Sequence, residues 1–299
     1  MFLFFLMLLR PQVVLSGASK GLMLWFEVIL PTLYPFLLLS SFLLTTGNLR
    51  LISNILGGLF CKFLNVSPNG SFVVLAGFLC GYPVGAKLAA DMYKSGYISR
   101  KEGCYLLSFC NNTSPSFIIN YLVLRTLGDK KLLLPSIVIL TAAPLIVSFF
   151  TRRFYRSEPL ENIRHSPQPS SDRDTWTFRE IDACIMDSFE TLIKVGGYII
   201  LFSVILSLLQ SIDTPAWFAC LLSFLEITNG LEILKSLHLT KAICYPLMLG
   251  LTAFGGLCAI AQTQCMVQKA GFGILPYITQ KLAAALTASL LGVLYLNIC

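Results

Sequence analysis

Residues that could bind a small polar molecule cluster at a break in one apolar segment, within the stretch FLCGYPVGAKLAADMYKSG at residues 78–96. The cluster comprises Gly81, Tyr82, Pro83, Gly85 and Lys87, with Asp91 one helical turn further on. Glycine and proline interrupt helices, and a helix that restarts after the break presents free N–H groups that favour an anion. Lys87 would add a positive charge, so the stretch suits a carboxylate or a phosphate. A purely structural ion pair between Lys87 and Asp91 is the alternative.

A second polar cluster lies in the next apolar segment, LLSFCNNTSPSFII. It consists of Asn111, Asn112, Thr113 and Ser114, followed by Pro115. Such residues would unwind a helix at membrane depth, and their amides and hydroxyls could bind a polar substrate or a coupling cation. The alternative is a loop outside the membrane between two short helices.

The second half of the chain contains a comparable break. Gly255 and Gly256 interrupt an apolar segment, and Gln262 and Gln264 follow them. The sequence LEITNG adds Glu226, Thr228 and Asn229. Glu226 is a candidate for coupling to H⁺ or Na⁺, with a position at the membrane surface as the alternative. Paired interruptions in two halves indicate the substrate site of a transporter.

The composition requires a membrane protein. Of 299 residues, 56% are hydrophobic and 12% are charged, whereas a soluble domain has roughly 25% charged residues. About 20 apolar residues span a bilayer. We predict nine apolar elements, one or two of which re-enter the membrane without crossing it, at roughly 2–17, 30–47, 71–92, 104–124, 132–150, 193–211, 215–234, 242–267 and 274–297.

The sequence favours neither an enzyme nor a nucleic-acid-binding protein. The two histidines, His165 and His238, have no catalytic or metal-ligand context, so we expect no catalytic residue, metal or cofactor. The net charge is +7, but the basic stretch within residues 151–177 also contains acids, prolines and serines. That composition does not indicate nucleic-acid recognition.

The polar stretch divides the chain into a first membrane half at 1–150, a cytoplasmic linker at 151–177 and a second membrane half at 178–299. Arginines near helix ends favour the cytoplasm for the linker. The halves echo each other, with FEVILPTLY in the first and FETLIKVGG in the second. We therefore predict an internal repeat, which is inverted if the segment at 71–92 re-enters and parallel if it crosses.

Two stretches have the spacing of amphipathic helices that lie in the membrane plane. Apolar pairs recur every four positions at 51–64, and a capping-box pattern at Thr177 precedes an amphipathic stretch at 177–192. We predict interfacial helices at both places. For the second stretch, a helix packed on neighbouring loops is the alternative.

The pair GYPVGAKLAADMYKSG and LLSFCNNTSPSFI resembles the YlbJ-type (SpoVV) sporulation integral membrane proteins, within the group that carries the nucleoside-recognition, or Gate, domain. GLMLWFEVILPTLYPFLLLSSFL, LEITNG and FGGLCAIAQTQ resemble the same family, so the likeness extends over nearly the whole chain. The resemblance implies an all-α polytopic fold similar to concentrative nucleoside transporters, with two repeats that each contain a re-entrant hairpin and an interrupted helix.

The resemblance also implies a function in endospore-forming bacteria. Proteins of this type are associated with movement of dipicolinate, a planar dianion, across the outer forespore membrane. A nucleoside transporter and a non-transporting scaffold or sensor for spore assembly remain as alternatives. The expected partners are a small anionic substrate, the bilayer and a coupling cation, with no nucleic acid. The sequence leaves the oligomeric state open.

Overall fold

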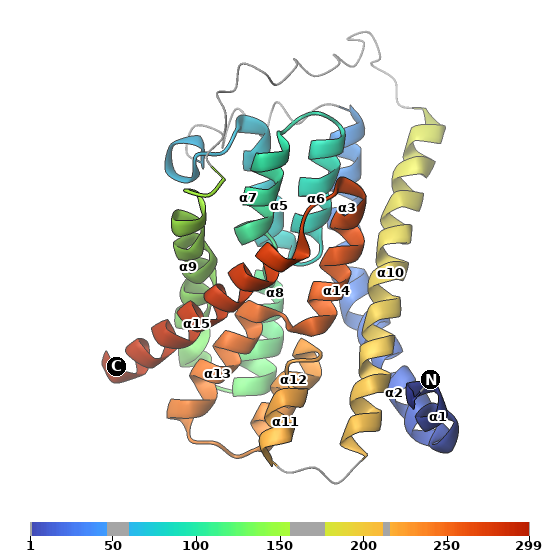
Figure 1. Ribbon diagram of the computed structural model, residues 1–299, viewed down its shortest axis with the longest axis vertical. Helices are drawn as coiled ribbons and strands as arrows, with labels where there is room; N and C mark the ends of the chain where they lie inside the picture. The colour runs from blue at the N-terminus through green and yellow to red at the C-terminus, as the bar shows by residue number, and fades with distance from the viewer. Residues whose placement is uncertain (1, 47–59, 156–176, 212–215, 299) are drawn as a thin grey trace.

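A computed structural model describes residues 2–46, 60–155, 177–211 and 216–298. The described residues form helices, short turns and connections, and contain no strand. The expected all-helical fold is therefore confirmed. Figure 1 shows an elongated molecule whose helices run mostly along its length.

Within the described residues, five helical stretches are long and apolar enough to cross a membrane. They are Pro11–Thr45, Lys130–Thr151, Phe178–Gln210, Lys241–Ala270 and Ile274–Ile298. Other apolar segments form shorter helices. The segment expected at 71–92 is divided between α5 (Pro68–Cys80) and α6 (Val84–Lys94), because Gly81 ends one helix and Pro83 precedes the next. A helix of 13 residues is only about 20 Å long, so it is too short to cross a hydrocarbon layer of about 30 Å.

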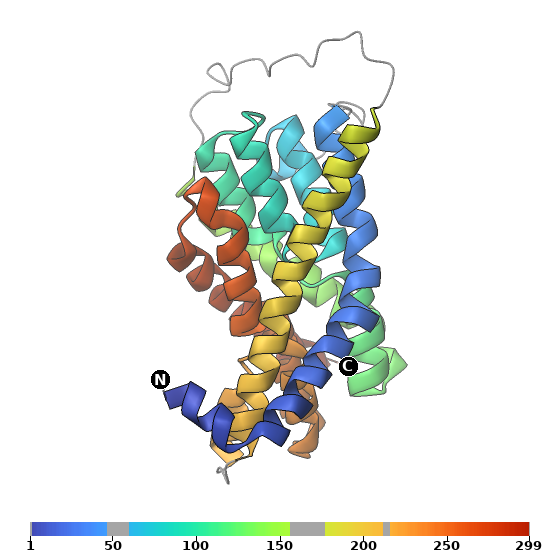
Figure 2. The same ribbon diagram turned by 90° about the vertical axis from the view of Figure 1, so that its right-hand side faces the viewer.

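Two long helical arms pack against each other along one side of the molecule (Figure 2). The first contains α2 (Pro11–Leu24), the π-helical segment η1 (Trp25–Ile29) and α3 (Leu30–Thr46), and the second is α10 (Phe178–Gln210). Small residues permit close contact, since a Cβ added at Gly17 or Gly21 would meet Ser207 or Ser203. The short helix α1 (Phe2–Leu9) precedes α2.

The expected interfacial helix at 177–192 is wrong, because these residues begin the continuous 33-residue helix α10. Its predicted start is confirmed: the backbone N–H of Thr177 donates to Glu180 Oε2 over 3.1 Å. Polar residues on this first part of α10 contact α3 and α6, as described below. The expected amphipathic helix at 51–64 lies largely outside the described residues, as does most of the linker at 151–177.

Two helical hairpins approach each other from opposite ends of the molecule (Figure 1). The first is α5–α6, whose turn at Gly81–Pro83 lies near mid-height. The second pairs α11 (Ala216–Leu222) with α12 (Ile227–Ser236), and its turn also points toward the middle. The helices within each hairpin contact one another.

Two interrupted helices pass beside these hairpins in opposite directions. The first descends through α7 (Arg100–Cys110), a break at 111–114, α8 (Pro115–Phe117) and the π-helical segment η2 (Ile118–Leu127). The second ascends through α13 (Lys241–Phe254), a break at Gly255 and α14 (Gly256–Val267). From the sequence alone, the break at Gly81 is expected to be equivalent to the break at Gly255. Tertiary structure makes the first a hairpin turn and the second an interruption within one helix.

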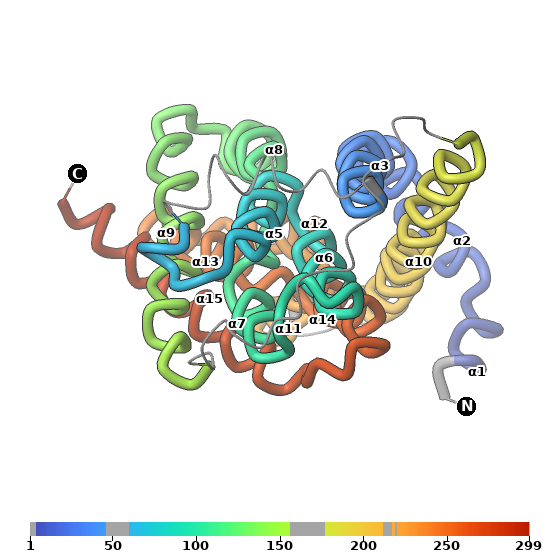
Figure 3. Tube along the Cα trace, turned by 90° about the horizontal axis from the view of Figure 1, so that it is seen from above, coloured from blue at the N-terminus to red at the C-terminus, as the bar shows by residue number. Residues whose placement is uncertain are grey.

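The remaining elements are η3 (Lys130–Leu132), α9 (Leu133–Thr151), η5 (Gln268–Ala270) and α15 (Ile274–Ile298). The helices α9, α13 and α15 pack against one another, whereas η5 continues α14 and contacts α6. Figure 3 shows α3 and α10 at one edge, the hairpin helices in the middle, and α9, α13 and α15 at the other edge. The hairpin turns and the helix breaks thus lie between two sets of long helices.

A buried carboxylate fixes the start of the first hairpin. Ser67 caps α5, and its N–H donates to Glu102 Oε1 of α7 over 2.6 Å. Glu102 is only 5% exposed, and Gly70 leaves the space that its carboxylate occupies. Burial raises the pKa of the Glu102 carboxyl above its ordinary value, and the bond from Ser67 partly opposes this rise.

Substitutions at Glu102 test this contact. Glu102→Ala leaves the Ser67 N–H without its acceptor and should reduce the free energy of unfolding by about 1–3 kcal/mol. Glu102→Gln keeps an acceptor and should be much milder. Because the folded pKa is raised, the wild type loses stability as pH rises from the ordinary carboxyl pKa through the folded value. The Tm of Glu102→Gln relative to the Tm of the wild type should therefore increase as the pH rises. An identical Tm for Glu102→Ala and wild type would contradict the assignment.

Candidate functional site

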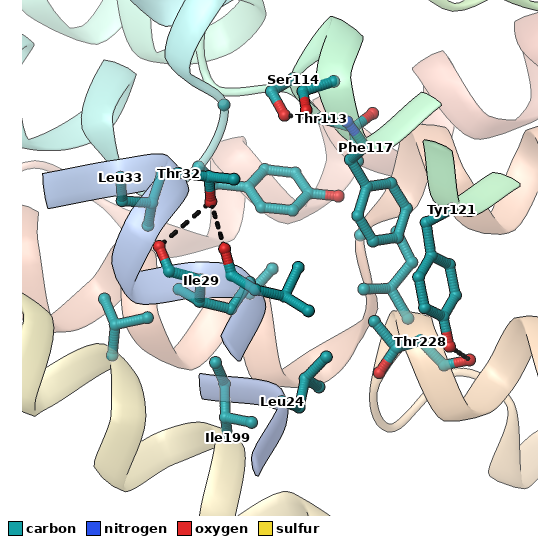
Figure 4. Close-up of a pocket in the computed structure, with 18 of the residues that line it drawn as sticks. Leu24, Ile29, Thr32, Leu33, Thr113, Ser114, Phe117, Tyr121, Ile199 and Thr228 are labelled. Carbon is teal, nitrogen blue, oxygen red and sulfur yellow. Dashed lines mark hydrogen bonds between the residues drawn. The ribbon is translucent and has the colours of Figure 1, made fainter. Parts of the chain in front are cut away.

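A cavity of about 330 Å³ lies where the hairpin turns, the helix breaks and the two arms meet (Figure 4). This volume is at the lower end of the range for small-molecule sites, roughly 300–1,000 Å³. Its walls come from η1, α3, the α5–α6 turn, the 111–114 break, η2, α10, α12 and α14. Irregular backbone at membrane depth is expected only where protein or a water-filled cavity satisfies it.

The first hairpin and the first break form one wall. Gly81, Tyr82, Thr113 and Ser114 all line the cavity. Gly81 has a φ of +83°, and a Cβ there would lie 2.8 Å from the backbone nitrogen of Ser114. A glycine is therefore required both by the backbone conformation and by the close approach of the two segments.

The opposite wall combines the second hairpin and the second break. Glu226 and Thr228 from the start of α12, and Gly255 from the break, line the cavity. Gly255 has a φ of +87°, and the Tyr82 hydroxyl occupies the space that a Cβ would need. The same hydroxyl donates to the Thr252 carbonyl over 3.3 Å. Tyr82 thus joins the first hairpin to the second interrupted helix.

The two π-helical segments also contribute to the cavity. Glu27, Val28 and Ile29 come from η1, and Asn120 and Tyr121 come from η2. Insertions of π-helical geometry occur frequently at functional sites, because they change which side chains and carbonyls face a given direction. Near η1, Pro31 has no N–H to donate to the carbonyl of Glu27, which favours irregular bonding there.

An aromatic pair provides a flat surface in the cavity wall. The rings of Phe117 and Tyr121 stack at 5.0 Å between centroids, with an interplanar angle of 15°. The Tyr121 hydroxyl donates to the Thr228 carbonyl over 3.2 Å, which fixes the ring against α12. Figure 4 shows both rings beside Thr228. A planar ring could stack against this surface.

Among the residues that the structure describes, three charged side chains line the cavity: Glu27, Arg125 and Glu226. Arg125 forms an ion pair with Glu232 over 3.5 Å. Glu226 is 3% exposed, and its carboxylate accepts bonds from the backbone and side chain of both Thr228 and Asn229. These donors at the start of α12 stabilise a buried negative charge.

Asn111 does not line the cavity but holds its wall in place. Its Nδ2 donates over 2.8 Å to Thr263 of α14 and over 2.8 Å to the hydroxyl of Tyr277 in α15. Its Oδ1 accepts from the backbone of Ala86 in α6 over 3.3 Å. The break after α7 is therefore connected to three other helices through one amide.

Lys87 lies outside the cavity lining, and its charge is neutralised within the protein. Its Nζ is 2.7 Å from Asp91 Oδ2 and 2.8 Å from Asp187 Oδ2. The predicted pair with Asp91 is present, and α10 contributes the second carboxylate. Ser41 of α3 also donates to Asp187 over 3.4 Å. The expected anion site at Lys87 is thus replaced by an ion network that connects α6 to both arms.

The other predicted site residues divide into two groups. Those at the cavity are Gly81, Tyr82, Thr113, Ser114, Glu226, Thr228 and Gln262. Those that do not line it are Pro83, Gly85, Lys87, Asp91, Asn111, Asn112, Asn229 and Gln264. Gly85 instead lies against the Cys110 carbonyl of α7, and Gln264 has a buried Oε1 without a hydrogen-bond partner.

The sequence interpretation missed Lys281 in α15, a lysine that is only 2% exposed. Its Nζ donates to the Asn111 carbonyl over 3.0 Å and to Asn112 Oδ1 over 3.4 Å. A charged residue inside an apolar segment was the available signal, and the same signal had selected Lys87. The contributions of Phe117 and Tyr121 carried no comparable local signal, since aromatic residues are common in apolar helices.

Replacement of Lys87 tests the ion network. Lys87→Met leaves Asp91 and Asp187 close together without their cation. The free energy of unfolding should fall by about 3 kcal/mol, the low end for a buried pair, because the Asp187 side chain is 47% exposed. Thermal unfolding in detergent measures the change.

Two further variants serve as controls for that measurement. Adding Asp187→Asn to Lys87→Met should restore part of the lost stability by removing one unpaired charge. Lys194→Met breaks the more exposed pair with Glu190 on the same helix and should cost less than about 1 kcal/mol. Equal effects of Lys87→Met and Lys194→Met would contradict the network.

Comparison with known proteins supports the family resemblance that the sequence indicates. No protein family model matches the chain, and no solved structure matches it. The chain is similar to the sporulation integral membrane protein YlbJ of Bacillus subtilis (strain 168), with 28% identity over 286 aligned residues, covering 82% of this chain and 69% of the relative. The resemblance indicated by the residues is therefore confirmed: the chain is an integral membrane protein and a distant homologue of sporulation integral membrane protein YlbJ.

Proposed function

We propose that this protein transports a small anionic metabolite, specifically dipicolinate, across the outer forespore membrane during sporulation. The observation that carries the proposal is the cavity, which lies where two hairpin turns and two helix breaks converge. Discontinuous helices that meet at a central site are typical of secondary transporters. The similarity to a sporulation protein supports the cellular context.

The proposed architecture is an inverted repeat of the kind found in concentrative nucleoside transporters and the Gate group. In this scheme α5–α6 and α11–α12 are re-entrant hairpins that correspond to each other. The interrupted helices α7–η2 and α13–α14 are the second corresponding pair, and their opposite directions support inversion (Figure 1). Alternating access would then move the hairpins relative to the arms α2–α3 and α10.

The chemistry of the cavity supports a planar polar substrate. Phe117 and Tyr121 offer a flat aromatic surface. Hydroxyl and amide groups of Thr113, Ser114 and Gln262 lie in the same lining and could bind carboxylate or ring-nitrogen atoms. Lys87 does not take part in the proposed site, since two carboxylates already pair with it.

Glu226 is the proposed coupling residue. Its carboxylate is buried in the cavity wall and is held by donors from α12. Its negative charge opposes entry of an anion, so binding of H⁺ or Na⁺ at Glu226 would favour entry of the anionic substrate. This arrangement predicts that cation and anion bind together.

Uptake of labelled dipicolinate by vesicles that contain the purified protein tests the proposed function. The wild type should show saturable uptake. Ala259 lines the cavity, so Ala259→Phe fills part of it and should reduce uptake to the background of empty vesicles. Leu286→Phe is the matched control, because Leu286 is 67% exposed on α15 and lies away from the cavity lining.

A nucleoside is the second candidate substrate, because most polar groups in the lining are uncharged and an aromatic pair is present. Competition with unlabelled uridine in the same vesicles distinguishes the two substrates. Competition and uptake of uridine without uptake of dipicolinate would favour the nucleoside. Absence of both activities in folded protein would favour the scaffold alternative.

Substitution at Glu226 tests the coupling role. Glu226→Gln removes the charge while keeping an acceptor for the donors of α12. Accumulation driven by an imposed H⁺ or Na⁺ gradient should fall on the order of tenfold, whereas exchange of labelled for unlabelled substrate without a gradient should persist. Glu190→Gln, at an exposed position of α10 outside the cavity lining, is the control. Unchanged gradient dependence in Glu226→Gln would exclude Glu226 as the coupling residue.

A further inference from the structure

Lys281 is a buried lysine whose hydrogen bonds, among the described residues, are with neutral groups. Its Nζ bonds to the Asn111 carbonyl and to Asn112 Oδ1, at 3.0 and 3.4 Å, and lies 5.4 Å from the centroid of the Tyr82 ring. Within the described part of the chain, no carboxylate forms an ion pair with Lys281. This environment differs from that of Lys87, which is paired twice.

A structural function explains only part of this arrangement. Asn111 is the C-cap residue of α7, and a cation near a helix C-terminus is favourable. A neutral donor would also satisfy the carbonyl, without the large penalty of burying an ammonium group. Ionisable residues retained inside the membrane usually serve a substrate or ion pathway. The retention of a lysine at this buried position therefore calls for an explanation beyond capping.

The position of Lys281 relates its charge directly to the cavity. The Tyr82 ring lies over the ammonium group, and Tyr82 also lines the cavity. The residues that accept from Lys281 immediately precede Thr113 and Ser114, which line the cavity as well. The Tyr82 ring and the backbone at 111–114 thus connect the ammonium group to the cavity lining.

The charges of the lining itself do not supply an unpaired cation. Arg125, the lining cation within the described residues, pairs with Glu232. Glu27 and Glu226 are negative. Without a further positive charge, the cavity would disfavour an anion. Lys281, when protonated, would supply that charge from beside the Tyr82 ring.

We propose that Lys281 is the specificity-determining residue that makes the cavity prefer an anionic planar ligand over a neutral one. The inference rests on the proposed function and assigns the anion preference of the same cavity to a residue outside its lining. At an effective dielectric constant of about 20, a unit charge on the far side of one aromatic ring changes affinity on the order of tenfold for each charge on the ligand.

Two ligands of the same shape test this assignment. Pyridine-2,6-dicarboxylate carries two negative charges, and pyridine-2,6-dicarboxamide is neutral. Binding of each to purified full-length protein is measured by calorimetry for wild type, Lys281→Met and Lys281→Gln. The wild type should bind the dicarboxylate at least about tenfold more tightly. Both variants should lose this preference while their affinity for the dicarboxamide stays close to that of the wild type.

Lys20→Met is the charge-matched control, since it removes one exposed positive charge on α2, away from the cavity lining. It should preserve the preference of the wild type. Lys281→Gln retains a hydrogen-bond donor near Asn111, so it still gives a result if Lys281→Met fails to fold. Thermal unfolding shows whether each variant is folded.

The outcomes separate this inference from the proposed function. A preference for the dicarboxylate that survives in a folded Lys281 variant would overturn the assignment. An equal loss of affinity for both ligands in the folded variants would also overturn the assignment, because removal of a structural cap would weaken the binding of both ligands alike. If the wild type binds neither compound, the proposed substrate class fails and the inference fails with it.

Discussion

Backbone that leaves a helix in apolar surroundings must find hydrogen-bond partners within the protein, and this constraint organises the whole molecule. The break after α7 satisfies it through Asn111, whose side chain reaches Ala86, Thr263 and Tyr277. Lys281 completes the arrangement by donating to the carbonyl of Asn111. Four helices, α6, α7, α14 and α15, are therefore held together at a point where none of them could satisfy the break alone.

The cavity follows from the same constraint. It lies where the hairpin turns and helix breaks meet two π-helical segments, a geometry that occurs frequently at functional sites. Gly81 lets the first hairpin approach the first break at Ser114, and Gly255 lets the second interrupted helix approach Tyr82. The Tyr82 hydroxyl then joins the first hairpin to α13 through the Thr252 carbonyl. The long arms close the remaining side with apolar residues such as Val195 and Ile199. The result is a small, mostly apolar site with a few fixed polar groups.

Charge is distributed so that the arms and the cavity have different electrostatic functions. Lys87, Asp91 and Asp187 form a network between α6 and α10, where each charge has an opposite partner. Near the cavity, Glu226 and Lys281 lie on different elements and are stabilised by neutral donors and acceptors. A closed network favours stability and register, whereas separated buried charges suit binding of ions. The proposed transport of an anion together with a cation depends on the separated buried charges, Glu226 and Lys281.

The sequence alone determined the membrane class, the helical fold, the breaks at residues 81–83, 111–114 and 255–256, and the homology to a sporulation membrane protein. Composition and local breakers encode these properties. Tertiary structure decided which residues meet. Lys87 found a partner 100 positions away, and Lys281 reached Asn111 across 170 positions. Contacts of this range leave no periodic signal in the sequence, because they depend on how separate helices pack. The same signal, a lysine in an apolar segment, therefore marked an ion pair at one position and a cation beside the cavity at another.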